Sequence, residues 1–292
     1  MQSMLKLIML ALALFFITEN VLAYNEPNHC LITQRAIDLL NHRFGLDYIT
    51  EAETNAILKG NSSEDAFGHK WLIRLWNQHF FNPLKPRQLW ERNKSIDVRF
   101  ERIADRCVAR ATASDFFFRV GEVVHHIQDA TNPAHVVPVY HGGPLKDKFD
   151  EQLITNYLPE TVALDTVTTY PAPFTLSILK PVAVRTLDNV KQPFVIQVAH
   201  HNAVSAKTID WSYFWQENAT AWFGAYGLLG APTSDKPRKK IDNYWNTEIR
   251  HGDTSYSIDK RDYERFSSQQ LEVAVRHTAN FIRYAKTLHG RP

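Results

Sequence analysis

Apolar residues recur at helical spacing in three stretches of this chain. Residues 31–40 carry the pattern and continue it to Phe44, where Gly45 is expected to end the helix. Residues 112–130 present a wide apolar surface for burial. Residues 269–288 form a closing amphipathic stretch. The pattern therefore predicts a mostly helical protein.

The rest of the chain has weaker patterns. Residues 87–111 mix basic and acidic side chains at helical spacing, which is typical of a solvated helix face, and residues 146–158 are predicted to form a short helix. Five prolines and several β-branched residues in 159–198 fit either loop or short strands. Residues 199–230 are aromatic-rich and predicted to be helical, whereas residues 231–262 are polar and predicted to be a surface loop.

The first residues are typical of an export signal. Lys6 precedes an apolar run over residues 7–17, and Val21 and Ala23 match a cleavage site. The run is too short to span a bilayer, which needs about 20 apolar residues, and no other segment comes near that length. Cleavage after Ala23 would leave a soluble protein that begins at Tyr24 and is secreted or periplasmic.

We therefore expect a signal peptide in residues 1–23 and one domain in residues 24–292. The predicted fold class is all-α, a multi-helix domain in which the region after residue 159 could form a small β or loop insertion. All candidate chemistry lies in residues 24–158, and residues 159–292 receive no role from the sequence.

Composition narrows the function less than the motifs do. A formal net charge of +2 is too small to indicate nucleic-acid binding by itself. The chain has 13 histidines, a high number that hints at metal binding. Its two cysteines, Cys30 and Cys107, could pair in an oxidising compartment or remain as two thiols.

The strongest chemical motif lies at the end of the helix predicted over 112–130. His125 and Asp129 are four residues apart, so a helix places them on one face. Pro133 should end the helix, and the following turn should bring His135 back toward that face. Imidazoles and a carboxylate that converge on one point are the ligands that zinc requires.

Further ligand-type side chains occur at suggestive positions on either side of this motif. The candidates are His29, Asp65 and His79 upstream, and His141, Asp150 and Glu151 downstream. His69 competes with His79 but lacks its His-Phe-Phe-Asn-Pro context. His126 points about 100° away from His125 on a helix and is interpreted as a core residue or as a support for the ligands.

At these residues the chain resembles the superfamily of zinc-dependent phospholipases C and S1-P1 nucleases, more closely its phospholipase C branch. The resemblance covers residues 24–158. It is carried by residues 28–40, Asp65, residues 79–83, residues 124–135 and, more weakly, residues 148–151. It implies an all-α domain that binds two or three zinc ions in a cleft.

The resemblance also implies which residues hold each ion. Asp65, His79, His125 and Asp129 would hold the first, and Asp129 would bridge to a second. The second ion would also bind His29 and the free amine and carbonyl of Tyr24.

A third ion would bind His135 with a downstream histidine and carboxylate. The histidine that the family places there falls near Lys146, so His141 is expected to replace it, paired with Asp150 or Glu151.

The predicted function is therefore that of an exported zinc-dependent phospholipase C, an enzyme acting on phosphatidylcholine at a membrane surface as a monomer. Asp65 is the expected proton acceptor, and Trp76 matches an aromatic residue of the family's choline pocket. The alternatives are a zinc-dependent single-strand nuclease and a metal-binding surface protein without turnover.

If the amine of Tyr24 is a ligand, protein that carries an N-terminal tag should hydrolyse phosphatidylcholine about 10–100-fold more slowly than trimmed protein. An amide nitrogen is a poor ligand, so the tag leaves one metal position incomplete. Measuring lipid hydrolysis before and after trimming to Tyr24 checks this. Equal rates would remove Tyr24 from the ligand set.

Overall fold

The computed structural model describes residues 26–65, 79–90, 95–140, 147, 149, 162–166, 169–201, 203–230 and 248–290. Its longer helices are α2 (Glu26–Phe44), α3 (Glu51–Asp65), α5 (Asp97–Ala109), α6 (Phe116–Asp129), α9 (Lys180–Val190) and α10 (Lys260–His289). Short helical turns are η1 (Arg87–Leu89), α7 (Pro133–Val136), η3 (Thr175–Leu179) and η4 (Trp211–Tyr213). Its strands are β1 (Pro193–His200), β2 (Ala203–Asp210), β3 (Trp215–Gln216), β4 (Ala225–Tyr226), β5 (Ile249–His251) and β6 (Thr254–Ile258).

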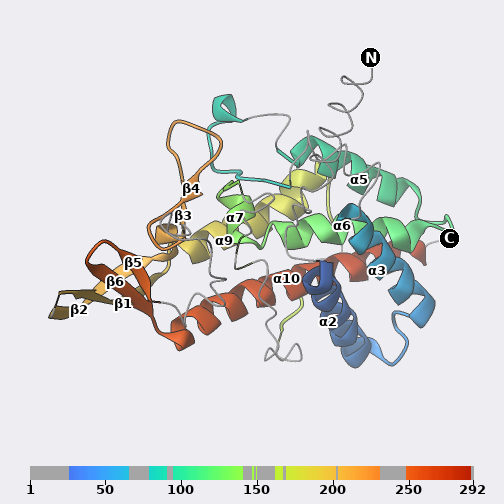
Figure 1. Cartoon of the computed structure of the whole chain (residues 1–292). Coiled ribbons are helices and arrows are strands. Elements are labelled where there is room, and N and C mark those ends of the chain that lie inside the picture. The colour runs from blue at the N-terminus through green and yellow to red at the C-terminus, as the bar shows by residue number, and fades with distance from the viewer. Residues whose placement is uncertain are drawn as a thin grey trace, which may run out of the picture.

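The protein is mostly helical, but the all-α prediction is only partly confirmed. Strands β1, β2, β5 and β6 form an antiparallel sheet in the order β2-β1-β6-β5, at one end of the helical body (Figure 1). The alternative of a small β insertion after residue 159 matches this sheet. The sheet includes β5 and β6, which lie where a surface loop was predicted.

The prediction that residues 199–230 are helical is wrong, because β2, η4, β3 and β4 occupy them. The decisive pattern is the alternation along β1, where Phe194 and Ile196 are buried and Val195 between them is exposed. The ring of Phe194 stacks on Trp211, with ring centroids 4.1 Å apart, and Trp211 stacks on Phe266 of α10. Rings from β1, η4 and α10 therefore pack together, and such long-range packing overrides the local preference.

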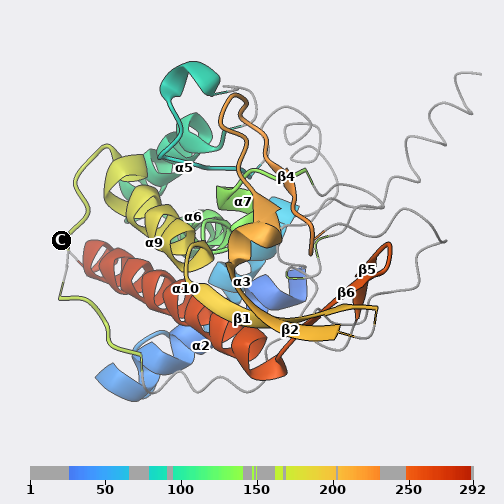
Figure 2. The same cartoon turned by 90° about the vertical axis from the view of Figure 1, so that its left-hand side faces the viewer.

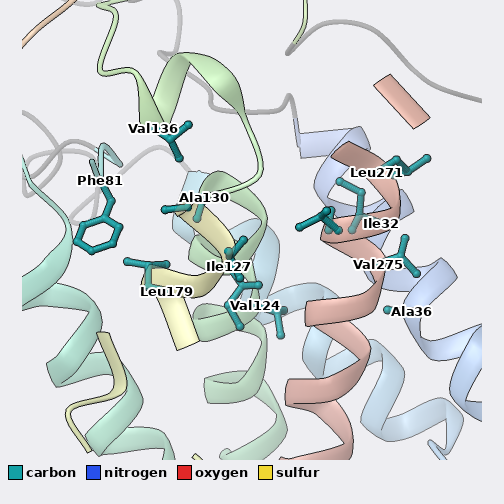
Figure 3. Close-up of a cluster of buried hydrophobic side chains, with 14 of the residues drawn as sticks. Ile32, Ala36, Phe81, Val124, Ile127, Ala130, Val136, Leu179, Leu271 and Val275 are labelled. Carbon is teal, nitrogen blue, oxygen red and sulfur yellow. The ribbon is translucent and has the colours of Figure 1, made fainter. Parts of the chain in front are cut away.

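The helices enclose one hydrophobic core around α6. Helix α10 packs against α2, α6 and α9, and it is the long red helix that crosses the body in Figures 1 and 2. Figure 3 shows Ile32 of α2 facing Leu271 and Val275 of α10, with Val124 and Ile127 of α6 nearby. Helix α10 begins earlier than the predicted residue 269, because Asp259 caps it by accepting a hydrogen bond from the backbone of Arg261.

Short-range chemistry sets the ends of α2 and α3. Helix α2 ends at Phe44, and Gly45 follows with a φ of 112°, which confirms the predicted stop. Thr50 and Glu53 form a reciprocal cap at the start of α3. The backbone N–H of Glu53 donates to Thr50 Oγ1 at 3.3 Å, and that of Thr50 donates to Glu53 Oε2 at 2.9 Å.

Helices α3 and α6 approach each other at two glycines. A Cβ atom on Gly121 would meet the carbonyl oxygen of Ile57 and lie 2.6 Å from the backbone nitrogen of Asn61. A Cβ atom on Gly60 would lie 2.8 Å from the backbone carbonyl carbon of Phe118. Only hydrogen atoms fit at this crossing, so both positions require glycine.

Neither cysteine forms a disulfide. The thiol of Cys30 lies 3.2 Å from Ser62 Oγ, while Cys107 is buried, and burial raises the pKa of its thiol to about 12. Of the two open interpretations, the structure therefore adopts two thiols. No helix within the described residues is long and apolar enough to cross a bilayer.

Gly121→Ala should lower the free energy of unfolding by about 1–3 kcal/mol, because the new methyl group must push α3 away from α6. Denaturant unfolding followed by circular dichroism measures the change. Gly290→Ala is the matched control, since its Cβ atom would lie 3.6 Å from the nearest atom, an ordinary contact. Equal stability of the two variants would contradict the tight crossing.

Candidate metal centre

Helix ends bring the predicted ligands together. His29 lies in the first turn of α2, Asp65 is the last residue of α3, and His125 and Asp129 lie in the last turns of α6. His79 belongs to the extended segment that pairs with α7 through a hydrogen bond from the N–H of Phe81 to the carbonyl of His135. All five ligand side chains are buried.

Among the residues that the structure describes, two groups could hold a metal ion, because within each group the candidate ligand atoms lie within 4.8 Å of one another. One group contains His79, His125, His126 and Asp129. The other contains His29, Asp65 and His125. These groups lie outside the hydrophobic clusters, and burying so many charged or polar side chains in one place is costly unless a cation joins them.

The ligand-type atoms around His125 Nε2 lie at distances typical of neighbouring metal ligands. His125 Nε2 lies 3.6 Å from Asp65 Oδ1, 3.5 Å from Asp129 Oδ2 and 3.3 Å from His79 Nδ1. His79 Nδ1 lies 2.9 Å from Asp129 Oδ2. Ligands that each sit about 2.0–2.1 Å from one ion at tetrahedral angles are separated by about 3.3 Å. These four distances are close to that separation. His79, His125 and Asp129 belong to one group of candidate ligands, whereas Asp65 joins His125 in the other.

The two oxygens of Asp129 face different histidines. Oδ2 faces His79 and His125, whereas Oδ1 lies 3.5 Å from His29 Nε2. His29 Nε2 also lies 3.8 Å from Asp65 Oδ2. One carboxylate can therefore serve two neighbouring positions, one on each side of it.

A buried hydrogen-bond network fixes the orientation of His29. Its Nδ1 donates to Gln128 Oε1 at 2.6 Å, which turns Nε2 toward the two carboxylates. Gln128 in turn donates to Thr33 at 2.8 Å and accepts from Asn61 at 3.1 Å. A supported imidazole of this kind is typical of metal ligands. Gln128 and Asn61 were not identified from the sequence, although Gln128 directly precedes Asp129.

The electrostatic field of the centre favours a cation. Burial and the nearby His29 hold the pKa of His125 well below its usual value. Burial alone would raise the pKa of Asp129, but His125 and the other histidines hold it well below the ordinary range. Burial alone would likewise lower the pKa of His29, yet the hydrogen bond and charge of Asp129 raise it. A neutral imidazole and an ionised carboxylate are the forms that bind metal.

His135 lies beside this centre rather than within it. Its Nδ1 donates to the backbone carbonyl of His79 at 2.8 Å, and the two rings are 6.4 Å apart between centroids. The turn after Asp129 and the short helix α7, which starts at Pro133, place it there. Neither metal-binding group includes His135, so its role in a third site stays a prediction.

His126 lies closer to the centre than its predicted supporting position suggested. Its Nδ1 lies 3.3 Å from Asp129 Oδ2, and its Nε2 lies 3.3 Å from Glu64 Oε2. Burial alone would lower the pKa of His126, but Asp129 and Glu64 raise it. Glu64, which the sequence interpretation overlooked, is buried and paired with Arg99.

Five predicted site residues lie outside the described residues. They are Tyr24, Trp76, His141, Asp150 and Glu151. The competing candidate His69 lies outside them as well. The binding of a second ion by Tyr24 and the third metal site therefore stay predictions.

Comparisons with known proteins give no independent assignment. No protein-family model matches the chain, and neither a curated protein nor a solved structure matches it.

Asp129→Asn should weaken binding of divalent ions by more than about 100-fold, because it removes the charge that both positions share. Wild-type protein should bind at least two ions, as measured by calorimetric titration and elemental analysis. Asp188→Asn, the same change on an exposed face of α9, should bind like wild type. Unchanged stoichiometry and affinity in Asp129→Asn would contradict the shared position.

Proposed function

We propose that this protein is an exported zinc-dependent phospholipase C, which hydrolyses glycerophospholipids to diacylglycerol and a phosphorylated head group. The observation that carries the proposal is the Asp129 carboxylate between two adjacent groups of candidate ligands. Its two carboxylate oxygens face His79 with His125 on one side and His29 on the other. Enzymes that cleave phosphodiesters commonly use a pair of divalent ions.

The donor set favours zinc among the divalent ions. The described ligands are imidazole nitrogens and carboxylate oxygens, with no thiolate in either group. Calcium and magnesium prefer shells made of oxygen atoms at higher coordination number, whereas imidazole suits zinc and its neighbours in the periodic table. The close spacing of ligand-type atoms around His125 Nε2 also suits a small ion such as zinc.

When bound, zinc ions polarise a phosphoryl oxygen and lower the pKa of a coordinated water. The protein supplies the remaining parts of the reaction. Asp65 is the proposed general base: it is buried, and its carboxylate faces His29 and His125 at 3.8 and 3.6 Å. The hydrogen bond to Gln128 keeps the ring of His29 directed at the centre, so this ligand is oriented before the substrate arrives.

The surroundings favour a lipid over a nucleic acid. The two segments that carry His79 and His135 continue into exposed apolar residues, Leu84 at 51% and Tyr140 at 50% exposure. The ring of Phe80, next to His79, packs edge-on against Phe223 with centroids 5.4 Å apart. A nuclease would instead need a cationic field for a polyanion, and the net charge is only +2.

The mature protein should release diacylglycerol from phosphatidylcholine vesicles, lose this activity with a chelator, and regain it with zinc. Little cleavage of single-stranded DNA is expected at the same enzyme concentration. Trp76→Ala should raise KM several-fold with a smaller effect on kcat, because its ring is expected to hold the quaternary ammonium.

Trp76→Phe is the matched control for this step, since it keeps an aromatic face and should recover most of the affinity. Strong cleavage of single-stranded DNA without diacylglycerol release would favour the nuclease alternative. Zinc binding without turnover of either substrate would favour a non-catalytic metal-binding protein.

A further inference from the structure

His126 connects Asp129 of the candidate metal centre to Glu64 on α3 and, through Glu64, to Arg99 on α5. On a helix, the residues three and four positions before Asp129 lie beside its side chain. In α6 these residues are His126 and His125. His126 Nδ1 lies 3.3 Å from Asp129 Oδ2, and its Nε2 lies 3.3 Å from Glu64 Oε2. The ring is fully buried and is wedged edge-on against His79, with centroids 4.9 Å apart.

Glu64 is itself held in place from α5. Its carboxylate pairs with Arg99, whose side chain is 12% exposed, while that of Glu64 is 1% exposed. Glu64 directly precedes Asp65, the metal-ligand candidate at the end of α3. A continuous row of charged and polar groups therefore runs from Asp129 through His126 and Glu64 to Arg99.

We propose that His126 is a positioning residue that fixes the Asp129 carboxylate, and that Glu64 and Arg99 hold His126 in that role. This inference rests on the proposed metal centre. It adds the contacts that hold the carboxylate of Asp129 in place. The row joins the two carboxylate ligands, because Glu64 ties the end of α3 to the same imidazole that contacts Asp129 on α6.

His126 is assigned a positioning role rather than a ligand role for two reasons. His79, His125 and Asp129 provide three closely spaced ligand atoms, and Asp65 Oδ1 lies 3.6 Å from the same His125 Nε2 and can complete the set. Both ring nitrogens of His126 also face carboxylates, and the outer carboxylate is balanced by Arg99.

Loss of His126 should affect the two metal positions unequally. The position on the His29 side depends on Asp129 Oδ1, and among the described residues it has fewer protein ligands than the His125 side. If the Asp129 carboxylate can rotate, the ion on the His29 side loses its bridge first. Changes to groups that orient a ligand reduce metal affinity by about 10–100-fold.

The test is titration of metal-free protein with zinc alone and with cobalt(II) alone, which also reports coordination through its absorption spectrum. His126→Phe keeps a planar ring and removes both hydrogen-bonding nitrogens, and we expect about 10–100-fold weaker binding of the more weakly held ion. His126→Asn retains a donor near Nδ1 and should recover part of that loss. His42→Phe, at an exposed position on α2, is the matched control and should bind like wild type.

Glu64→Gln provides an independent variant if His126→Phe does not fold. It keeps the size of the side chain and removes its charge, so it should weaken the same ion by a smaller factor. Unchanged affinity in both variants would overturn the proposal. So would a cobalt(II) spectrum showing that His126→Phe removes a ligand from the tightly held ion, since His126 would then bind metal directly.

These titrations do not depend on turnover, so they separate the two proposals. Weaker zinc binding in His126→Phe, with no lipid hydrolysis by wild-type protein, would support the positioning role and refute the phospholipase. Lipid hydrolysis by wild-type protein, with unchanged zinc binding in both variants, would support the enzyme and refute the positioning role.

Discussion

The close crossing of α3 and α6 is the constraint on which the candidate centre depends. Gly60 and Gly121 let the two backbones approach until only hydrogen atoms fit between them. That approach brings Asp65, at the end of α3, to within 3.6 Å of His125 on α6. A larger residue at either glycine would separate the carboxylate from the imidazole, and the coordination shell would open. Backbone packing therefore sets the geometry before any metal binds.

Around this crossing, buried polar side chains stand where a core would otherwise hold apolar ones. Gln128 holds His29, and the row of His126, Glu64 and Arg99 reaches the far side of Asp129. Buried carboxylates and imidazoles would normally weaken a fold, because each loses its hydration. Here they are joined to one another and to a site that attracts a cation. Apolar side chains of α2, α6 and α10 pack together in the same helical body (Figure 3).

The chemistry proposed for the protein follows from this arrangement more than from the fold class. A shared carboxylate with a histidine set on each side can hold two cations close together. Two close cations are suited to phosphodiester cleavage whatever alcohol the phosphate carries. The choice of substrate depends instead on the segments around the centre, where Leu84 and Tyr140 expose apolar surface. In the proposed function, metal chemistry and substrate selection thus depend on separate parts of the molecule.

The sequence alone determined the ligand-bearing helix and the stop of α2. These depend on local rules: the four-residue spacing of His125 and Asp129, the turn at Pro133, and the freedom of Gly45. Helix α10 was predicted from its periodicity and begins earlier because of its Asp259 cap.

Tertiary structure alone decided the rest. Phe194 of the sheet of β1, β2, β6 and β5 stacks on Trp211, which stacks on Phe266 of α10, and no local pattern reveals these contacts. The roles of Gly60, Glu64 and Gln128 exist only where separate helices meet. These roles depend on short distances between residues that are far apart in the sequence, so the spacing of residues along the chain does not reveal them.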